Sequence, residues 1–114
     1  MAFTDPSFSI GIEEEYLLVD RATRDLVRDM PQALFDAAQQ ALQGQVAREF
    51  LKSQIEVGTS VHKSPGQAGA ELAHLRRTVA DLAAQHGLAP IAASTHPFAR
   101  WSTQEPTERA RYQA

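Results

Sequence analysis

The chain opens with a run in which apolar positions surround three consecutive glutamates. Residues 8–20, FSIGIEEEYLLVD, have the composition of a buried β-strand. Side chains alternate between the two faces of a strand, so Glu13 and Glu15 share one face while Glu14 points to the other. The polar residues 20–25 then predict a turn, and residues 26–28 predict a short antiparallel return.

The rest of the chain alternates between helical and strand-like periodicity. Two helices are predicted, the first opened by Pro31 and ended by Gly44, the longer one capped by Ser64 and ended by Gly87. Strand patterns cover residues 45–59 and 88–93, loop residues follow at 94–101, and another helix is predicted around Pro106. This order of elements predicts a mixed α/β (α+β) fold with at least one antiparallel strand pair and flanking helices.

A second acidic position lies in the strand-like segment 45–59. Glu56 sits between Ile55 and Val57 and therefore faces the opposite side of the strand from both. Glu49 precedes Glu56 by an odd number of residues, which places it on the other face of an unbroken strand. It joins Glu56 only if a bulge intervenes.

Glu13, Glu15 and Glu56 form a candidate metal site. Paired carboxylates between apolar neighbours repel each other and resist losing water, so a fold keeps them most readily around a hard cation. Pure oxygen ligation favours Mg²⁺ or Mn²⁺ over zinc. The alternative is a solvent-facing acidic strip on an antiparallel sheet, and the first strand alone does not separate the two interpretations.

The four histidines differ in their setting. His74 and His86 fall on the long predicted helix and are expected to be exposed or partly packed there. His62 follows the second acidic strand and could line the same mouth. His96 lies in a tight loop at a strand end, where functional residues gather, and is a candidate substrate-facing residue. No nucleophile elbow, Walker A loop or dinucleotide fingerprint is present.

Composition narrows the class of protein. The 114 residues are 43% hydrophobic and 22% charged, as in one ordinary globular domain. A net charge of -3 offers no electrostatic footprint for nucleic acid, and the absence of cysteine excludes disulfides and thiolate metal ligands. No stretch has the roughly 20 apolar residues of a membrane span, and the first residues lack the pattern of a signal peptide. We therefore expect a soluble, cytoplasmic protein.

The chain carries three ordered motifs: GIEEEYLLVD at residues 11–20, QIEVGT at 54–59 and STHPFARW at 94–101. They resemble the opening signature, the second acidic strand and the loop after the third strand of the glutamate–cysteine ligase type 2 family, also called the carboxylate–amine ligase family. Any one of these motifs is weak, but their order and spacing across residues 8–112 are specific.

The resemblance implies a glutamine synthetase-like catalytic fold that holds ATP, Mg²⁺ (or Mn²⁺) and small-molecule substrates. It also implies an activity: ATP activates a carboxylate, such as the γ-carboxylate of glutamate, as an acyl phosphate that an amine then attacks. Glu13, Glu15 and Glu56 match the family's metal-ligand glutamates. Thr59 and His96 match motif positions that we expect to bind substrate.

Members of this family are several hundred residues long and carry a Gly-x-His-Val-His segment that this chain lacks. We therefore expect residues 1–114 to be the N-terminal part of a single ligase catalytic domain, apparently truncated and inactive alone. Its incomplete sheet would leave edges that favour association, including homo-oligomers. The alternative function is a non-catalytic binding or structural module that retains the fold.

Overall fold

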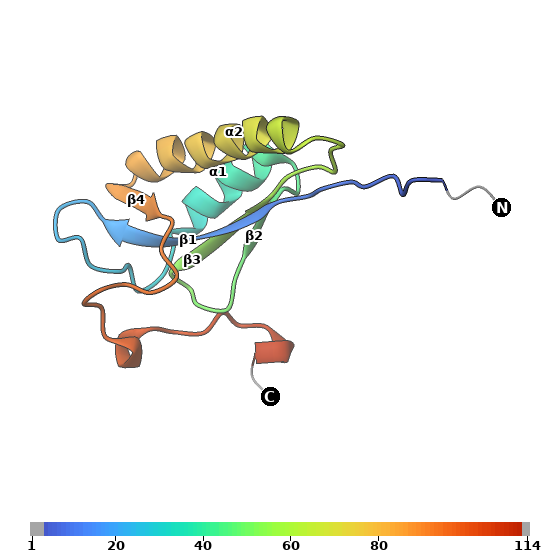
Figure 1. Cartoon of the computed structure of the whole chain (residues 1–114). Helices are drawn as coiled ribbons and strands as arrows, with labels where there is room; N and C mark the ends of the chain where they lie inside the picture. The colour runs from blue at the N-terminus through green and yellow to red at the C-terminus, as the bar shows by residue number, and fades with distance from the viewer. Residues whose placement is uncertain (1–3, 113–114) are drawn as a thin grey trace.

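A computed structural model of the protein describes residues 4–112. Its regular elements, in chain order, are β1 (Glu13–Asp20), α1 (Gln32–Leu42), β2 (Val46–Arg48), β3 (Gln54–Gly58), α2 (Pro65–Ala84), β4 (Leu88–Ile91) and two short 3-10 turns, η1 (Trp101–Thr103) and η2 (Ala110–Tyr112). Figure 1 shows the strands beneath the two helices, with the segment from residue 4 to the start of β1 extending away from the body. No helix in residues 4–112 is long and apolar enough to cross a membrane.

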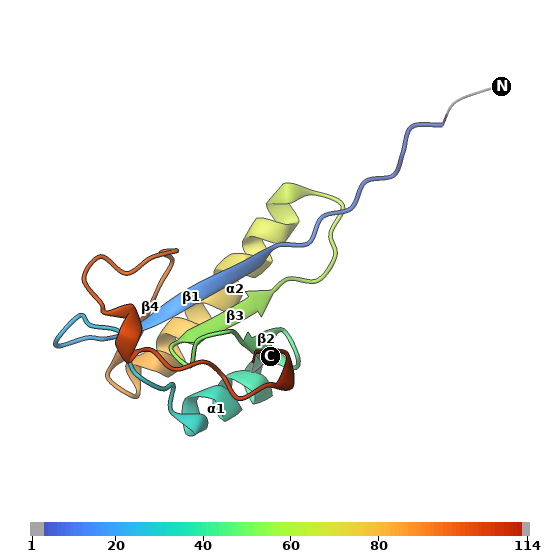
Figure 2. The ribbon, with the colours of Figure 1, turned by 90° about the horizontal axis from the view of Figure 1, so that it is seen from below.

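The four strands form one antiparallel sheet in the order β2-β3-β1-β4. Both helices cover the same face of this sheet, and the C-terminal segment runs past the opposite face (Figures 1 and 2). We call this opposite face the open face. The predicted mixed α+β fold with an antiparallel sheet and flanking helices is confirmed, since helices and sheet are segregated into layers.

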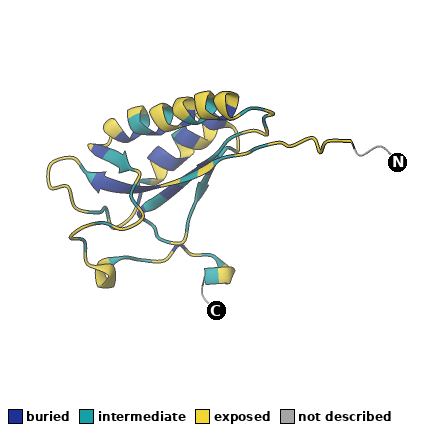
Figure 3. Cartoon of the chain, viewed as in Figure 1, coloured by how far each residue is buried: buried dark blue, intermediate teal, exposed yellow. Residues whose placement is uncertain are grey.

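Alternating strand positions and helical stripes build the core between the sheet and the helices. Fully buried side chains from β1, β3, α1 and α2 meet there. Figure 3 marks buried residues on the strands and on both helices. The largest are Tyr16, Leu18, Leu34, Ile55, Val57, Leu75 and Val79. Burial of each aliphatic side chain contributes about 1.5–3 kcal/mol, so this layer anchors the strands that carry the acidic residues.

The helix boundaries follow the predicted local chemistry. The Ser64 hydroxyl accepts a hydrogen bond from the Gln67 N–H at 3.3 Å, and Pro65 occupies the first turn of α2. At the end of α1, Gln43 takes a left-handed conformation, and Gly44 follows with a φ of 88°. Glycine adopts such a φ without steric cost, which ends the helix at the predicted position.

Three predicted strands are shorter in the structure. The strand predicted over residues 88–93 forms β4 only over Leu88–Ile91. The ladder of β1 begins at Glu13 rather than residue 8, because β3 ends at Gly58 and beyond it only an isolated bridge joins Ile10 to His62. The predicted return at residues 26–28 is likewise reduced to a bridge between Leu26 and Val19.

Two other predictions were wrong. Residues 45–59 are a hairpin of β2 and β3 instead of one strand, with the turn at residues 49–53. No helix begins at Pro106, which bridges Leu51 of that turn. The reason is that the backbone around Pro106 is occupied by tertiary hydrogen bonds to the turn, leaving none for a helical ladder.

Candidate metal centre

The open face carries glutamates from neighbouring strands at matched positions. In the register of β1 and β3, Glu15 lies directly opposite Glu56, and Glu13 lies opposite Gly58. Side chains in directly opposed positions are about 5 Å apart at Cβ, so the Glu15 and Glu56 carboxylates are forced close together. The predicted shared face for Glu13, Glu15 and Glu56 agrees with this register.

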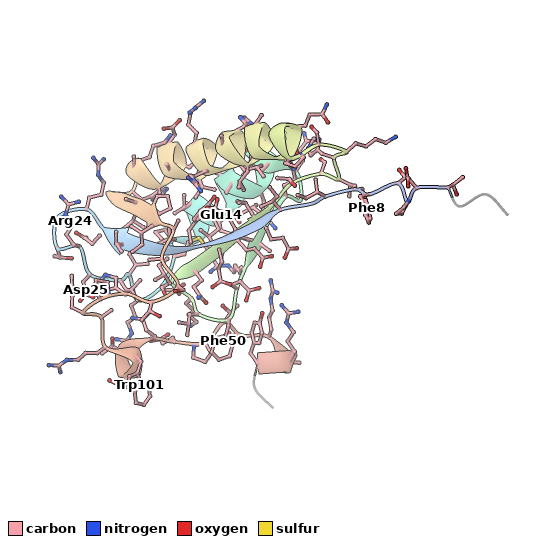
Figure 4. All side chains as sticks on the ribbon, viewed as in Figure 1. Phe8, Glu14, Arg24, Asp25, Phe50 and Trp101 are labelled. Atoms are coloured by element: carbon pink, nitrogen blue, oxygen red, sulfur yellow. The ribbon has the colours of Figure 1, made fainter. Side chains whose placement is uncertain are left out.

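Glu14 is separated from that face and paired on the helix side. Its carboxylate accepts hydrogen bonds from the Tyr16 hydroxyl at 2.6 Å and from the Arg76 guanidinium of α2. Burial, followed by the Glu14 carboxylate, raises the pKa of Tyr16 to about 12. Figure 4 labels Glu14 on β1, between the sheet and α2. Its charge is therefore compensated within the fold.

Glu49 lies on the open face, with Glu15 and Glu56, because the chain reverses at the hairpin. Ala47 pairs with Glu56, and Glu49 lies two residues beyond Ala47, hence on the same face of the sheet. One carboxylate oxygen each from Glu15, Glu49 and Glu56 lie within 4.8 Å of one another. The sequence-based placement of Glu49 on the other face was wrong because it assumed an unbroken strand. We call Glu15, Glu49 and Glu56 the acidic cluster.

Desolvation and repulsion between carboxylates both oppose ionisation of the acidic cluster. Desolvation raises the pKa of Glu56, and the charges of Glu49, Glu13 and Glu15 raise it further. Desolvation and then the charge of Glu49 raise the pKa of Glu15, partly offset by a hydrogen bond from Gln54. Like charges at this spacing favour a counter-charge between them.

Gln54 orients the Glu15 carboxylate. Its amide oxygen accepts the Leu51 N–H at 2.8 Å, and its amide nitrogen donates to Glu15 Oε1 at 2.6 Å. Because a backbone N–H can only donate, the first bond determines which end of the amide faces Glu15. Strand alternation places Gln54 on the same face as Glu56, two residues away, but does not by itself predict this hydrogen bond to Glu15.

Glu13 lies beside the acidic cluster rather than in it. Together with Glu56, Gly58 and Thr59 it lines a shallow cavity of about 280 Å³. The Thr59 hydroxyl accepts the Ile12 N–H at 2.9 Å, which ties the start of β1 to the end of β3. The hydroxyl proton of Thr59 stays free to donate, so its expected contact with substrate remains a prediction.

His96 uses both ring nitrogens within the fold. Nδ1 accepts the N–H groups of Phe98 at 3.2 Å and Ala99 at 3.0 Å, and Nε2 lies 2.8 Å from the Arg24 carbonyl. This arrangement requires a proton on Nε2, which donates to that carbonyl. His96 thus closes its own loop onto the turn after β1. No contact within residues 4–112 tests the predicted role of His96 in binding substrate.

His62 does not face the acidic cluster. Its Nε2 lies 2.5 Å from the Glu71 carboxylate of α2, and Glu71 also accepts hydrogen bonds from Gln45 and from Ser60. This network joins α2 to the ends of β2 and β3. The hydrogen bonds of His62 and Glu71 therefore attach α2 to the sheet.

The donor set of the acidic cluster suits a hard divalent cation. Three carboxylates converge, all of their ligand atoms are oxygens, and the cluster lies on the face of the sheet that the helices leave uncovered. Mg²⁺ is usually bound in proteins through one or two carboxylates, with waters or phosphate oxygens completing its octahedron. The donor chemistry of the cluster is therefore compatible with Mg²⁺ or Mn²⁺.

Comparison with known proteins places these motifs in a family. The family model of glutamate–cysteine ligase family 2 (GCS2) matches residues 9–114. Proteins named "Putative glutamate--cysteine ligase 2" are similar to this chain: that of Jannaschia sp. is 53% identical over 96% of this chain, that of Rhodospirillum rubrum 52% over 95%, and that of Roseiflexus castenholzii 44% over 97%. The chain spans 29% of the length of each of these relatives. On the match of the family model, the chain belongs to glutamate–cysteine ligase family 2.

Proposed function

We propose that this chain supplies the cation-binding face of an ATP-dependent carboxylate–amine ligase of the glutamate–cysteine type. The observation that carries the proposal is the convergence of Glu15, Glu49 and Glu56 to within 4.8 Å at their carboxylate oxygens. It is supported by membership in a family whose model is described as glutamate–cysteine ligase.

The proposed reaction has two steps. An oxygen of the substrate carboxylate attacks the γ-phosphorus of ATP, the bond from that phosphorus to the β-bridging oxygen breaks, and ADP leaves. The resulting acyl phosphate is attacked at its acyl carbon by the amine nitrogen. The carbon–oxygen bond to phosphate then breaks, inorganic phosphate leaves, and the nitrogen loses a proton to give the amide. The proposed substrates are glutamate or a similar carboxylate, and an amine such as that of cysteine.

The residues of the chain have defined parts in this proposal. Glu15, Glu49 and Glu56 hold Mg²⁺ or Mn²⁺, and Gln54 keeps the Glu15 carboxylate turned toward the site through its 2.6 Å hydrogen bond. Glu13, which shares a cavity wall with Glu56, extends the set of ligands toward a second ion. When bound, a divalent cation neutralises nucleotide phosphates and stabilises charge on the transferred phosphoryl group.

A Mn²⁺ titration of the 114-residue chain, followed by the EPR signal of free Mn²⁺, tests the cation site. Wild type is expected to bind, and Glu15→Gln to bind at least tenfold more weakly. Asp81→Asn removes one carboxylate from an exposed position of α2 and serves as the charge-matched control. Absence of binding in wild type would favour the alternative, a non-catalytic module that keeps the fold.

The proposed turnover is tested in a protein of the length of these relatives, of which the chain spans 29%. With ATP, glutamate and an amine present, that protein is expected to release ADP and phosphate. Glu13→Gln and Glu15→Gln are expected to reduce this release by at least a hundredfold, as the loss of a preorganised charge at the reacting phosphoryl group requires. Full turnover by either variant would remove that residue from the proposed metal site.

A further inference from the structure

The segment 104–112, here called the C-terminal strap, pairs with the turn of the β2–β3 hairpin. The Lys52 N–H donates to the Glu105 carbonyl at 2.8 Å, and an isolated bridge joins Leu51 to Pro106. Figures 1 and 2 show the strap crossing below the open face, close to the hairpin turn. The turn that carries Glu49 is therefore held from outside by residues more than fifty positions away in sequence.

Thr107 forms hydrogen bonds with the backbone of Glu49 and of the next residue, Phe50. Its N–H donates to the Phe50 carbonyl at 2.7 Å, and its hydroxyl donates to the Glu49 carbonyl at 2.5 Å. Thr107 is only 7% exposed, one of two buried polar side chains in residues 4–112. A buried hydroxyl that loses its acceptor is costly, so this bond is maintained in the folded chain.

The Glu49 carboxylate is coupled to the same piece of backbone. Its Oε2 accepts the Phe50 N–H at 2.9 Å, so the side chain follows the peptide that Thr107 holds. The strap is reinforced on both sides of Thr107: the Phe50 and Tyr112 rings pack edge to face at 5.2 Å, and Lys52 Nζ lies 3.1 Å from Glu105. Figure 4 shows Phe50 at the lower end of the hairpin, above the strap.

We propose that Thr107 is a positioning residue for the cation site, acting through Glu49. The inference rests on the proposed metal role of the acidic cluster and adds a residue outside it. Glu15 and Glu56 are placed by the sheet register, whereas Glu49 lies in the turn, beyond the last residue of β2. Of the three ligands, Glu49 thus depends most on a contact from another segment. Without the Thr107 hydroxyl the Glu49 carbonyl loses its hydrogen bond to the strap, and the Glu49 carboxylate is held less firmly in the cluster.

A double-mutant cycle in the 114-residue chain tests this inference, with Mn²⁺ affinity measured by EPR. Thr107→Val is expected to weaken Mn²⁺ binding roughly tenfold, as replacing a group that orients a metal ligand does. In a Glu49→Gln background the same substitution is expected to have no further effect. In a Glu15→Gln background it is expected to keep its effect. A general weakening of the fold would instead reduce Mn²⁺ affinity in both backgrounds.

Matched variants keep the test sharp. Thr107→Ser retains the hydroxyl and is expected to bind as wild type. Thr107→Ala removes the hydroxyl together with the neighbouring methyl group, adds no new apolar group, and replaces Thr107→Val if that variant does not fold. Thr103→Val is the control, because the exposed Thr103 hydroxyl donates to the Arg100 carbonyl at 2.8 Å within η1. It is expected to leave Mn²⁺ affinity unchanged.

The outcomes separate this inference from the proposed function. If wild type binds Mn²⁺ and Glu49→Gln weakens it, but Thr107→Val and Thr107→Ala do not, the positioning role is overturned while the metal site stands. Equal losses from Thr107→Val in the wild-type and Glu49→Gln backgrounds would also overturn it. If wild type shows no Mn²⁺ affinity, the metal site and the positioning role fall together.

Discussion

Replacing Glu56 by glutamine is expected to stabilise the metal-free chain. Glu56 has two carboxylate neighbours in the acidic cluster, each with an oxygen within 4.8 Å. Two unit charges at that distance repel by roughly 0.9 kcal/mol in water, and physiological salt reduces this to about half. The two contacts together predict a gain of about 1 kcal/mol at pH 7. For a domain of this size that corresponds to a rise in melting temperature of about 4 °C.

The pH dependence of this gain has a definite sign. The pKa of Glu56 is raised in the folded chain, by desolvation first and by Glu49 next. The contribution of Glu56 to stability is therefore fullest below its ordinary pKa of 4.5 and is lost as the pH rises through the raised value. The free energy of unfolding of Glu56→Gln should therefore exceed that of wild type as the pH rises through the raised pKa. At acid pH the two should be equal.

Cation binding should reverse the order of stabilities. At a free Mn²⁺ concentration of a hundred times Kd, wild type gains about 2.7 kcal/mol, whereas a variant with a hundredfold weaker site gains only about 0.4 kcal/mol. Urea unfolding with and without Mn²⁺, read by circular dichroism, measures both effects, and Asp81→Asn controls for net charge. A Glu56→Gln chain that is less stable than wild type without metal, or that gains as much from Mn²⁺, would refute the electrostatic reasoning.

Three further predictions concern the scaffold. Hydrogen bonds from His62, Gln45 and Ser60 lower the pKa of Glu71 to about 2, so Glu71 contributes stability above its ordinary pKa of 4.5 that is lost as the pH falls toward 2. Glu71→Gln should flatten the decline of the urea midpoint over that window, and parallel curves would contradict this. Ser64→Ala removes the cap of α2 and should cost about 1 kcal/mol in urea unfolding, against no change for Ser102→Ala in η1. Leu75→Ala empties a position that is 0% exposed and should cost about 3 kcal/mol, and a loss below 1 kcal/mol would show that the core collapses around it.

Local patterns predicted the parts of the site that depend on strand alternation. The separation of Glu13 and Glu15 from Glu14 follows from a period of two, and so does the face of Glu56 relative to Ile55 and Val57. These relations survive because each lies inside one strand. The cap at Ser64 and the end of α1 at Gly44 were predicted for the same reason, since their chemistry is contained in a few adjacent residues.

The position of Glu49 depends on where the strand-like segment 45–59 breaks into a hairpin, and the alternation of polar and apolar residues did not show that break. The segment 45–59 is far longer than the usual strand of five or six residues, and that length was the available signal for a break. Its turn lacks the Asn-Gly or Asp-Gly pair that marks tight hairpins. The turn is held instead by the strap, a contact between residues distant in sequence, so neither Glu49 nor Thr107 could be placed from local chemistry.

The pairing of Glu14 with Arg76 and Tyr16 has a consequence for the electrostatic field of the sheet. Of three adjacent carboxylates on one strand, the middle one is matched by a cation on the helix side, while Glu15 faces the open side among other carboxylates. The acidic cluster therefore adds negative charge on the open side of the sheet, while the charge of Glu14 is compensated on the helix side. A cation in solution is attracted toward the open side by this charge before any ligand contact is made.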